Sequence, residues 1–315
     1  MPGSDSLSSL GRAHSSARKG LARAAVRDMR ARAPSAPGRV RAPLSVAEHV
    51  SAGDFVRALA KGLLVIESFD TASPSMTLSQ VAKKTGLSRG TARRLLLTLV
   101  ELRYAGFDGK YFDLQPRALK LGFAYLHSRN LWQLSQAYMA QLVERVHESC
   151  SIAVLDDSEI VYVARVPTAT RIMSINLGIG TRLPAFATSM GRVLLGGLSA
   201  SALSRLLEQL SPLPQYTPKT VTKPTALLRE IDVARKQGWA LVDQELETGL
   251  RSIAVPIVNG STHPVAALNI GTQASRWPIL KLTQEVLPLL KQTAGSISML
   301  LEASGERSSA AKNQR

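Results

Sequence analysis

Three helical patterns in a row, from residue 54 to residue 102, constrain the fold more than any other feature of the sequence. Apolar residues recur three or four apart from Phe55 to Phe69, which predicts a first helix that Asp54 caps. A second helix is predicted from its Thr77 cap to a basic last turn and Gly86, because glycine commonly ends helices. The spacing of these helices predicts a small helical unit.

The third helix and the segment after it indicate what kind of unit this is. Ser88 caps a helix that runs to Leu102. An Asp108–Gly109 pair between aromatic residues is a strong hairpin signal, and the type I′ turn that it favours needs positive φ at both central residues. Three short helices and a two-stranded hairpin with Lys110 at its tip predict a winged helix-turn-helix over residues 53–115. A three-helix unit with no nucleic-acid role is the alternative.

Basic residues are in excess, and the excess is greatest near the N-terminus. The chain holds 39 Lys and Arg and 23 Asp and Glu, a formal net charge of +16. Residues 1–52 lack aromatic side chains and a sustained apolar period, so we expect a disordered basic arm. Its Arg and Ser content also resembles an organelle transit peptide. The charge distribution is typical of proteins that bind nucleic acid or an anionic surface, although a solvated basic surface would show it too.

The rest of the sequence predicts a second domain that combines helices and strands. Residues 116–129 form an amphipathic linker helix, and we expect its apolar stripe to pack against a second copy of the chain. Residues 130–304 alternate between helical and strand periods, with a hairpin around 156–159 and a strand at Ile172–Leu177. The prediction is an α+β chain whose C-terminal domain is a mixed sheet flanked by helices, followed by a disordered tail at 305–315.

Four stretches of the sequence are shared with one known family. They are Leu87–Leu96, Arg182–Arg192, Val242–Pro256 and Ala266–Asn269. Together they make residues 54 to 301 resemble the IclR family of transcriptional regulators. The last two stretches are similar to the branch that governs protocatechuate, 4-hydroxybenzoate and β-ketoadipate catabolism. The resemblance implies a winged helix-turn-helix, a linker helix and a C-terminal effector-binding domain of the GAF- or PAS-like type.

One position departs from the family pattern. Members commonly have glycine before the tyrosine that begins the wing, where this chain has Arg103. A glycine there would supply a left-handed residue at the end of the third helix. A residue with a Cβ atom costs about 1 kcal/mol in that conformation. We therefore expect backbone strain at Arg103.

The resemblance also implies which residues contact DNA. The N-terminal part of the recognition helix enters the major groove, where an arginine can bond both acceptors of a guanine edge. Any one side chain on this part of the helix could equally contact only phosphate or solvent. Double-stranded operator or promoter DNA is the expected partner of a homodimer or a dimer of dimers. The expected DNA-binding residues are Ser88, Arg89, Thr91, Arg93, Arg94 and Lys110.

The family binds its effector between the sheet and the helix that follows the Leu183–Ala185 segment. Mapped onto this chain, the positions that contact small carboxylates are Ser189, Met190, Asp243, Ser252, Asn269 and Gly271. A small aromatic or dicarboxylic acid would also favour a guanidinium for bidentate pairing. Arg165 is the residue assigned to that role, with Arg171, Arg182 and Arg251 as further candidates. Each of these arginines could instead be an ion-pair partner of Asp243, Glu245 or Glu247.

Other chemistries find little support in the sequence. Asp243, Glu245 and Glu247 could imitate a paired-carboxylate hydrolase, and His147 with Cys150 could form a metal or nucleophile pair. Neither set has further partners nearby, so we expect no enzyme activity, no cofactor and no metal. A single cysteine excludes an intrachain disulfide, and no apolar run reaches the length of a spanning helix. A bacterial, cytoplasmic, nucleoid-associated protein is expected.

Overall fold

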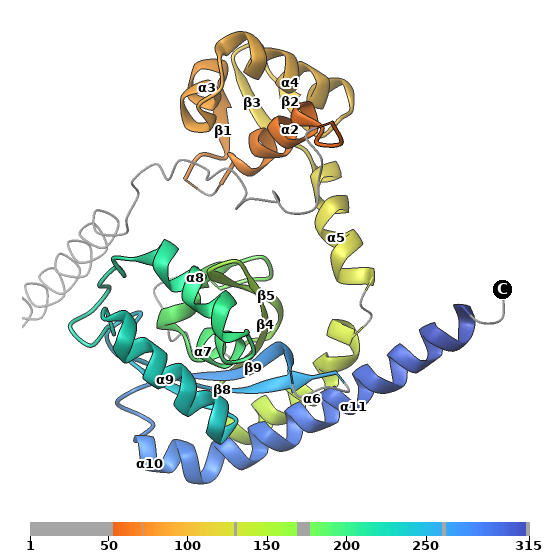
Figure 1. The fold of residues 1–315 in the computed structure, drawn as a ribbon. Helices are drawn as coiled ribbons and strands as arrows, with labels where there is room; N and C mark the ends of the chain where they lie inside the picture. The colour runs from red at the N-terminus through yellow and green to blue at the C-terminus, as the bar shows by residue number, and fades with distance from the viewer. Residues whose placement is uncertain (1–52, 71, 129–130, 169–176, 260–262, 313–315) are drawn as a thin grey trace, which may run out of the picture. The chain divides into compact units, whose positions relative to one another are not determined.

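The computed structural model describes residues 53–70, 72–128, 131–168, 177–259 and 263–312. The chain divides into two compact units, Met1–Phe123 and Ala124–Arg315. Figure 1 colours the described residues of the first unit from orange to yellow and those of the second from yellow to blue. The predicted arm at residues 1–52 lies outside the described residues, as does most of the strand expected at Ile172–Leu177. Each unit is considered by itself below.

The first unit contains the three predicted helices. They are α2 (Arg57–Glu67), α3 (Leu78–Thr85) and α4 (Arg89–Glu101). Thr77 and Gln80 form a reciprocal capping box at α3, which ends at Gly86 with a left-handed φ of 70°. Ser88 caps α4 by accepting a hydrogen bond from the Thr91 backbone N–H at 3.2 Å. The prediction is confirmed for both of these helix starts.

The start of α2 differs from the prediction. The residue at its N-cap position is Val56, which makes no side-chain cap hydrogen bond, so the prediction of Asp54 as cap was wrong. Phe55, Leu59 and Leu63 are exposed, whereas Val65 is fully buried in the core of this unit. The prediction of a helix is therefore confirmed, but only the C-terminal half of its apolar stripe packs inside the unit.

The wing contains one strand more than predicted. Strand β3 (Tyr111–Leu114) lies between β1 (Ser75–Thr77) and β2 (Ala105–Phe107), and both pairings are antiparallel. In the turn, Gly109 has a φ of 103° while Asp108 is not at positive φ, so the type I′ prediction was wrong. The Asp108 carboxylate accepts hydrogen bonds from the N–H groups of Lys110 and Tyr111 at 2.8 and 2.7 Å, which stabilises this alternative turn.

Two residues at the end of α4 illustrate what sequence spacing can predict. Arg103 has a φ of 62°, which confirms the expected left-handed residue between α4 and the wing. Leu102, the last residue of the predicted helix, is half exposed. The helix ends at Glu101, so its period no longer applies there.

The predicted linker helix consists of a 3₁₀ turn, η1 (Pro116–Ala118), and α5 (Leu119–Ser128). Leu119, Leu121, Phe123 and Tyr125 are all exposed on it. Among the described residues, no helix is long and apolar enough to cross a membrane.

The second unit is built on one six-stranded sheet in the order β6-β5-β4-β9-β8-β7. Every described pairing in it is antiparallel, so the prediction of a mixed sheet was wrong. The sequence places helices between some of its strands, and a helical connection is typical of parallel strand pairs. The strands are β4 (Ser149–Asp156), β5 (Glu159–Val166), β6 (Arg182–Pro184), β7 (Ala240–Asp243), β8 (Leu250–Val258) and β9 (Pro264–Gln273).

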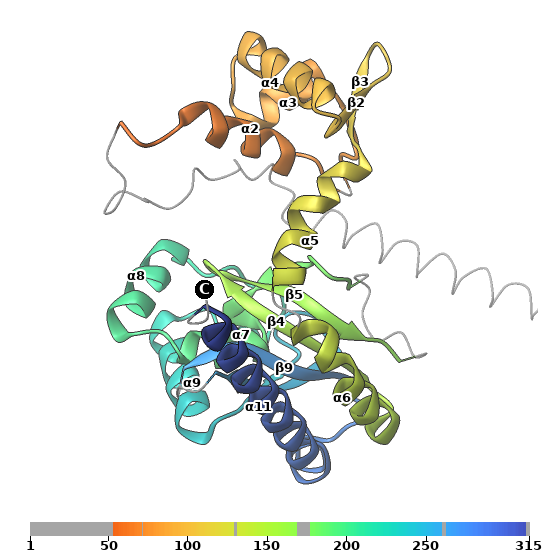
Figure 2. The ribbon, with the colours of Figure 1, turned by 90° about the vertical axis from the view of Figure 1, so that its right-hand side faces the viewer.

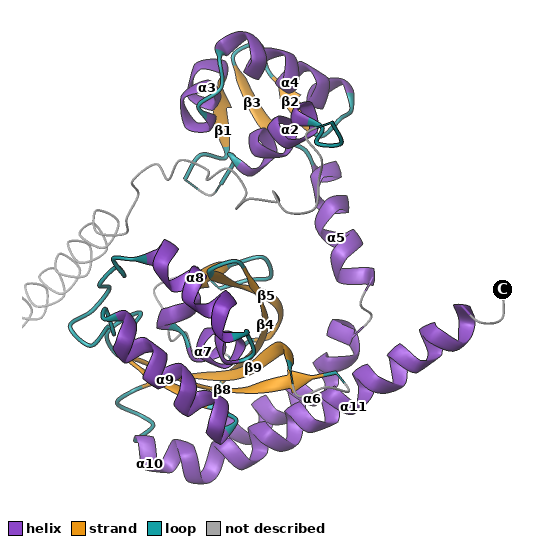
Figure 3. Ribbon diagram, viewed as in Figure 1, coloured by secondary structure: helices purple, strands orange, loops and turns teal. Residues whose placement is uncertain are grey.

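Helices cover both faces of this sheet (Figure 3). One face packs on α6 (Leu131–Val146) and α11 (Leu287–Lys312), which lie side by side in Figures 1 and 2. A short helix, α10 (Ile279–Lys281), and a π-helical segment (Leu282–Val286) precede α11. Because α11 runs to Lys312, the residues expected to form a disordered tail from 305 are helical up to that point.

The other face carries a short 3₁₀ turn, η2 (Ala185–Ala187), and three helices. They are α7 (Ser189–Gly196), α8 (Ala200–Leu210) and α9 (Pro224–Gln237). Every residue of α7 is buried. Its Gly191 lies so close to η2 that an added Cβ atom would be only 2.0 Å from the Ala185 carbonyl oxygen. The glycine therefore lets helix and turn pack in contact.

We predict that Arg103→Gly stabilises the protein, because glycine adopts positive φ without the Cβ clash. The expected gain is about 1 kcal/mol in the free energy of unfolding. Urea unfolding of the parent and the variant measures it. Arg103→Ala removes the same side chain but keeps the strain, and so should give no gain. Equal stability of the two variants would contradict the assignment of strain to this position.

Candidate functional site

The first half of α4 presents a row of basic side chains. Arg89, Arg93 and Arg94 are exposed, and Arg89 and Arg93 lie one helical turn apart. Among the described residues, no carboxylate lies within ion-pair distance of any of these three guanidinium groups. The face therefore carries uncompensated positive charge, as a surface for a polyanion would.

The remaining predicted DNA-binding residues are Ser88 and Thr91 at the start of α4 and Lys110 on the wing. Ser88 is taken up by the helix cap and by a hydrogen bond from its hydroxyl to the Thr91 Oγ1 at 3.0 Å. Lys110 is at the tip of the wing, with its ammonium 5.0 Å from the centre of the Tyr111 ring. Sequence analysis did not single out Arg117, which stacks over the Tyr104 ring at 5.5 Å beside the base of the wing.

In the second unit, strand register places most of the predicted effector residues on the sheet face that α7 covers. Paired residues of neighbouring strands point to the same face. One row consists of Ser149, Gly271 and Ser252, from β4, β9 and β8. The next row consists of Arg165, Ser151, Asn269 and Ala254, from β5, β4, β9 and β8.

The centre of these two rows is open. A Cβ atom added to Gly271 would have no heavy atom within 4 Å. In a central strand of a sheet that is covered on both faces, such a position is normally filled. The open space is bordered by the hydroxyls of Ser149 and Ser252 in its own row and by Asn269 in the next. We call this space, with its bordering residues, the Gly271 hollow.

The start of α7 lies beside the Gly271 hollow. The Ser189 hydroxyl donates a hydrogen bond to Ser252 Oγ at 2.9 Å, which joins the first residue of α7 to β8. Thr188 caps the helix by accepting from the Gly191 N–H at 3.1 Å. Ser189 and Met190 are almost fully buried, so this contact belongs to the packed interior.

Arg165 is the predicted guanidinium that shares a row, and so a sheet face, with Asn269. Its Nη1 donates to Ser151 Oγ at 3.3 Å, within the row that also holds Asn269. Arg182 is elsewhere, in exposed ion pairs with Asp156 and Glu159 at the β6 edge. Arg171 lies outside the described residues.

Asp243 is not brought together with the other predicted effector residues. It pairs with Arg251, whereas Ser252 pairs with Val242, so Asp243 and Ser252 lie on opposite faces of the sheet. Its carboxylate accepts from Arg251 and from Lys219, at 2.8 and 2.6 Å. Partial burial raises the pKa of Asp243, but the hydrogen bonds from Lys219 and Arg251 outweigh it and hold the pKa below its usual value. The ion-pair interpretation of Arg251 is the one that the contacts support.

A buried ion pair that sequence analysis missed fixes α7 against the loop after β7. Arg192 is 2% exposed, and its Nη2 donates to Glu245 Oε2 at 2.7 Å. The same carboxylate oxygen accepts from the Val221 N–H at 3.0 Å. Arg192 ends the family stretch Arg182–Arg192, but its charge alone suggests an exposed residue, so only the three-dimensional contact reveals its role.

The alternative chemical sets do not form a site. The Cys150 thiol is fully buried, and desolvation raises its pKa, which makes it a poor nucleophile. Glu245 is bound to Arg192 and Asp243 to Arg251, so neither is poised as a general acid or base. In the described part of the chain, no group of three His, Cys, Asp or Glu residues could hold a metal ion.

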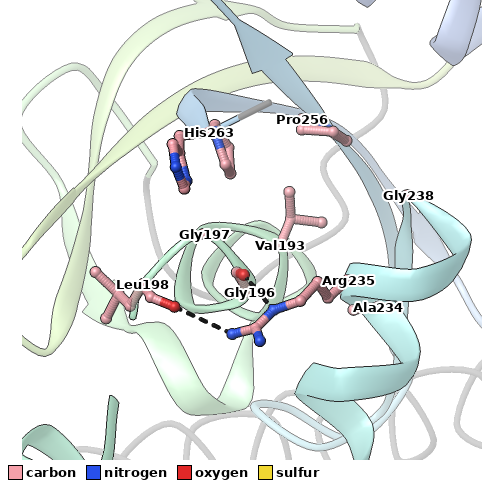
Figure 4. A pocket seen from close by; sticks show the side chains of 10 residues that line it. Val193, Gly196, Gly197, Leu198, Ala234, Arg235, Gly238, Pro256 and His263 are labelled. Atoms are coloured by element: carbon pink, nitrogen blue, oxygen red, sulfur yellow. Dashed lines mark hydrogen bonds between the residues drawn. The ribbon is translucent and has the colours of Figure 1, made fainter. Parts of the chain in front are cut away.

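A separate pocket of about 350 Å³ lies at the opposite end of α7. Val193, Leu198, Pro256 and Pro264 form part of its lining. Figure 4 shows the Arg235 guanidinium against the end of α7, where it donates to the carbonyl oxygens of Gly196 and Leu198 at 2.6 and 3.1 Å. These bonds satisfy the last turn of α7, and none of the predicted site residues lines this pocket.

Comparison with known proteins identifies the family. The Bacterial transcriptional regulator IclR C-terminal domain matches residues 123–299, and the IclR helix-turn-helix domain matches residues 58–109. The Pca regulon regulatory protein of Pseudomonas putida is 41% identical over 75% of this chain and 81% of its own length. The p-hydroxybenzoate hydroxylase transcriptional activator of Acinetobacter baylyi is 37% identical over 81% of this chain and 95% of its own length.

Solved structures agree with this match. A crystal structure from Rhodococcus sp. RHA1 is 47% identical, with a TM-score of 0.68 over 79% of this chain and 100% of that chain. An IclR homolog from Microbacterium hydrocarbonoxydans, complexed with 4-hydroxybenzoate, is 27% identical, with a TM-score of 0.67 over 78% of this chain and 99% of that chain. The family and the fold class expected from the sequence are confirmed. The chain belongs to the IclR family of bacterial transcriptional regulators, which bind DNA and are not enzymes.

Proposed function

We propose that this regulator controls genes of aromatic-acid catabolism and responds to a small aromatic or dicarboxylic acid bound in the Gly271 hollow. Two similar proteins are named for the Pca regulon and for p-hydroxybenzoate hydroxylase, and a third was solved with 4-hydroxybenzoate. The observation that carries the proposal is the open, polar-bordered space above Gly271 on a central strand of the sheet. An effector-independent DNA-binding protein would gain nothing from such a space.

The surroundings of the Gly271 hollow suit a carboxylate that is attached to a ring. Arg165 provides a guanidinium, and Ser189 and Ser252 provide hydroxyls beside the first turn of α7. The apolar body of the acid would lie over Gly271 and Ala254, which leave room because they have small side chains or none. Asp243 would act indirectly in this arrangement, by holding Arg251 and the start of β8 in place.

DNA binding is proposed to occur through α4 and the wing of two or four copies of the chain. Exposed apolar residues on α2 and α5, including Leu59, Leu119 and Phe123, support association with a second copy. A dimer would place two α4 helices on two half-sites of an operator. This assignment makes the protein a cytoplasmic regulator associated with the nucleoid. The second candidate, a regulator of another small carboxylic acid, differs only in the acid that fills the Gly271 hollow.

We predict that Arg93→Ala weakens binding to a promoter fragment by about 1 to 3 kcal/mol and relaxes the preference at one base pair, if Arg93 reads a base. Fluorescence anisotropy with a set of single-base variants of the fragment measures both effects. Arg205→Ala, on exposed α8, removes the same charge from the second unit and serves as the control. Unchanged affinity and unchanged selectivity in Arg93→Ala would remove this residue from the interface.

We predict that the full chain binds at least one acid from a panel of protocatechuate, 4-hydroxybenzoate and β-ketoadipate, as measured by calorimetry. Gly271→Val should lower that affinity at least tenfold, about 1.4 kcal/mol, because its methyl groups occupy the hollow. The thermal midpoint of Gly271→Ala without ligand should stay unchanged, since an added Cβ contacts nothing within 4 Å. Gly271→Ala provides the graded control with a smaller loss. Undiminished binding by Gly271→Val would place the effector elsewhere.

A further inference from the structure

Asn269 borders the Gly271 hollow with a polar atom that has no partner. Its side chain is only 7% exposed. Its Oδ1 atom is buried, and no donor within the described residues reaches it. Buried polar groups are nearly always hydrogen-bonded, because an acceptor removed from water without a partner is destabilising. An exception beside an open space therefore points to a ligand group that completes the bond.

The neighbours of Asn269 do not supply that group. On one side in its row, the Ser151 oxygen accepts from Arg165 at 3.3 Å, and on the other side Ala254 carries only a methyl group. The next position of β9 on the same face is Gly271, which has no side chain and open space above it. Within the described residues, none of these neighbours donates a hydrogen bond to Asn269 Oδ1.

The chemistry of the missing partner is restricted. An ionised carboxylate has acceptor oxygens only, so it cannot bond to Asn269 Oδ1. A hydroxyl on the ring of an aromatic acid can donate. It can also accept, so it matches either orientation of the side-chain amide, whereas a carboxylate would match only the orientation that turns the NH2 group toward it.

We propose that Asn269 accepts a hydrogen bond from a ring hydroxyl of the effector, and that this bond makes the protein prefer hydroxylated aromatic acids to benzoate. The inference rests on the proposed function, because it assigns a specificity-determining residue within the same site. A site built to bond a hydroxyl rejects the analogue that lacks it, since the buried polar group is then left unsatisfied. Benzoate has the same ring and carboxylate as the hydroxybenzoates. A difference in affinity between them therefore reports on the hydroxyl group alone.

The test is calorimetric titration of the full chain with benzoate, 3-hydroxybenzoate and 4-hydroxybenzoate. The parent should bind at least one hydroxybenzoate about 10- to 100-fold more tightly than benzoate. Asn269→Leu keeps a similar volume without the acceptor, and should bring that ratio close to one while benzoate binding is retained. Asn269→Ala provides a second variant without the acceptor, in case the leucine disturbs the sheet. Circular dichroism verifies that each variant is folded.

Thr272→Val is the matched control, because Thr272 is the buried neighbour of Gly271 on the same strand but faces the other side of the sheet. It removes a hydroxyl and should leave the selectivity ratio unchanged. If the parent binds benzoate and both hydroxybenzoates equally, or if the Asn269 variants keep the parent's ratio, the inference is overturned while the proposed site stands. If the parent binds none of the three acids nor any acid of the earlier panel, the proposed function fails, and this inference with it.

Discussion

The buried ion pair between Arg192 and Glu245 is the constraint on which the arrangement around the candidate site depends. Arg192 comes from α7, and Glu245 from the loop that follows β7. Arg192 also donates to the Phe186 carbonyl oxygen at 3.3 Å, while Thr220 donates to the Glu245 carbonyl oxygen at 2.6 Å. Removing Arg192 would leave Glu245 buried without its cation, at a cost of about 3 to 5 kcal/mol. Removing Glu245 would leave Arg192 with only the half-exposed Glu230, at 3.6 Å, as a carboxylate partner. The pair therefore fixes α7 over the sheet, with Ser189 against Ser252.

The sheet itself is asymmetric in a way that makes room for α7. On β8, branched Ile253, Val255 and Ile257 face α6 and α11, whereas the opposite face carries small residues such as Ser252 and Ala254. Small side chains let a completely buried helix approach the strands closely. The Gly271 hollow lies in the row of Ser252, where α7 begins, so the open space follows from the position of the helix start and from the missing side chain.

The helix boundaries of the first unit could be predicted largely from residues that are close in sequence. Thr77, Gly86 and Ser88 act through bonds within a few residues, so their roles could be predicted from spacing. Strand β1 was missed because three residues carry little periodic signal, and its pairing with β3 depends on contacts distant in sequence. The direction of strand pairing and the burial of α2 are likewise decided by tertiary packing, which propensity and period do not encode.

The candidate site was only partly accessible from the sequence. The family resemblance suggested Ser189, Ser252, Asn269 and Gly271. Strand register places the last three around one open space, and a hydrogen bond joins Ser189 to Ser252. Asp243 stood in the same set, but only the register reveals that it faces the other side of the sheet. The sequence alone does not tell which strand residues lie on the face of the sheet that binds a ligand.

The central claim is that an acid in the Gly271 hollow changes the affinity of the regulator for DNA. The direct test measures the dissociation constant of a promoter fragment with and without saturating acid, and that of the acid with and without the fragment. The account predicts that both constants change by the same factor, because coupling between two binding sites is reciprocal. An acid that binds the protein but leaves the affinity for DNA unchanged would contradict it.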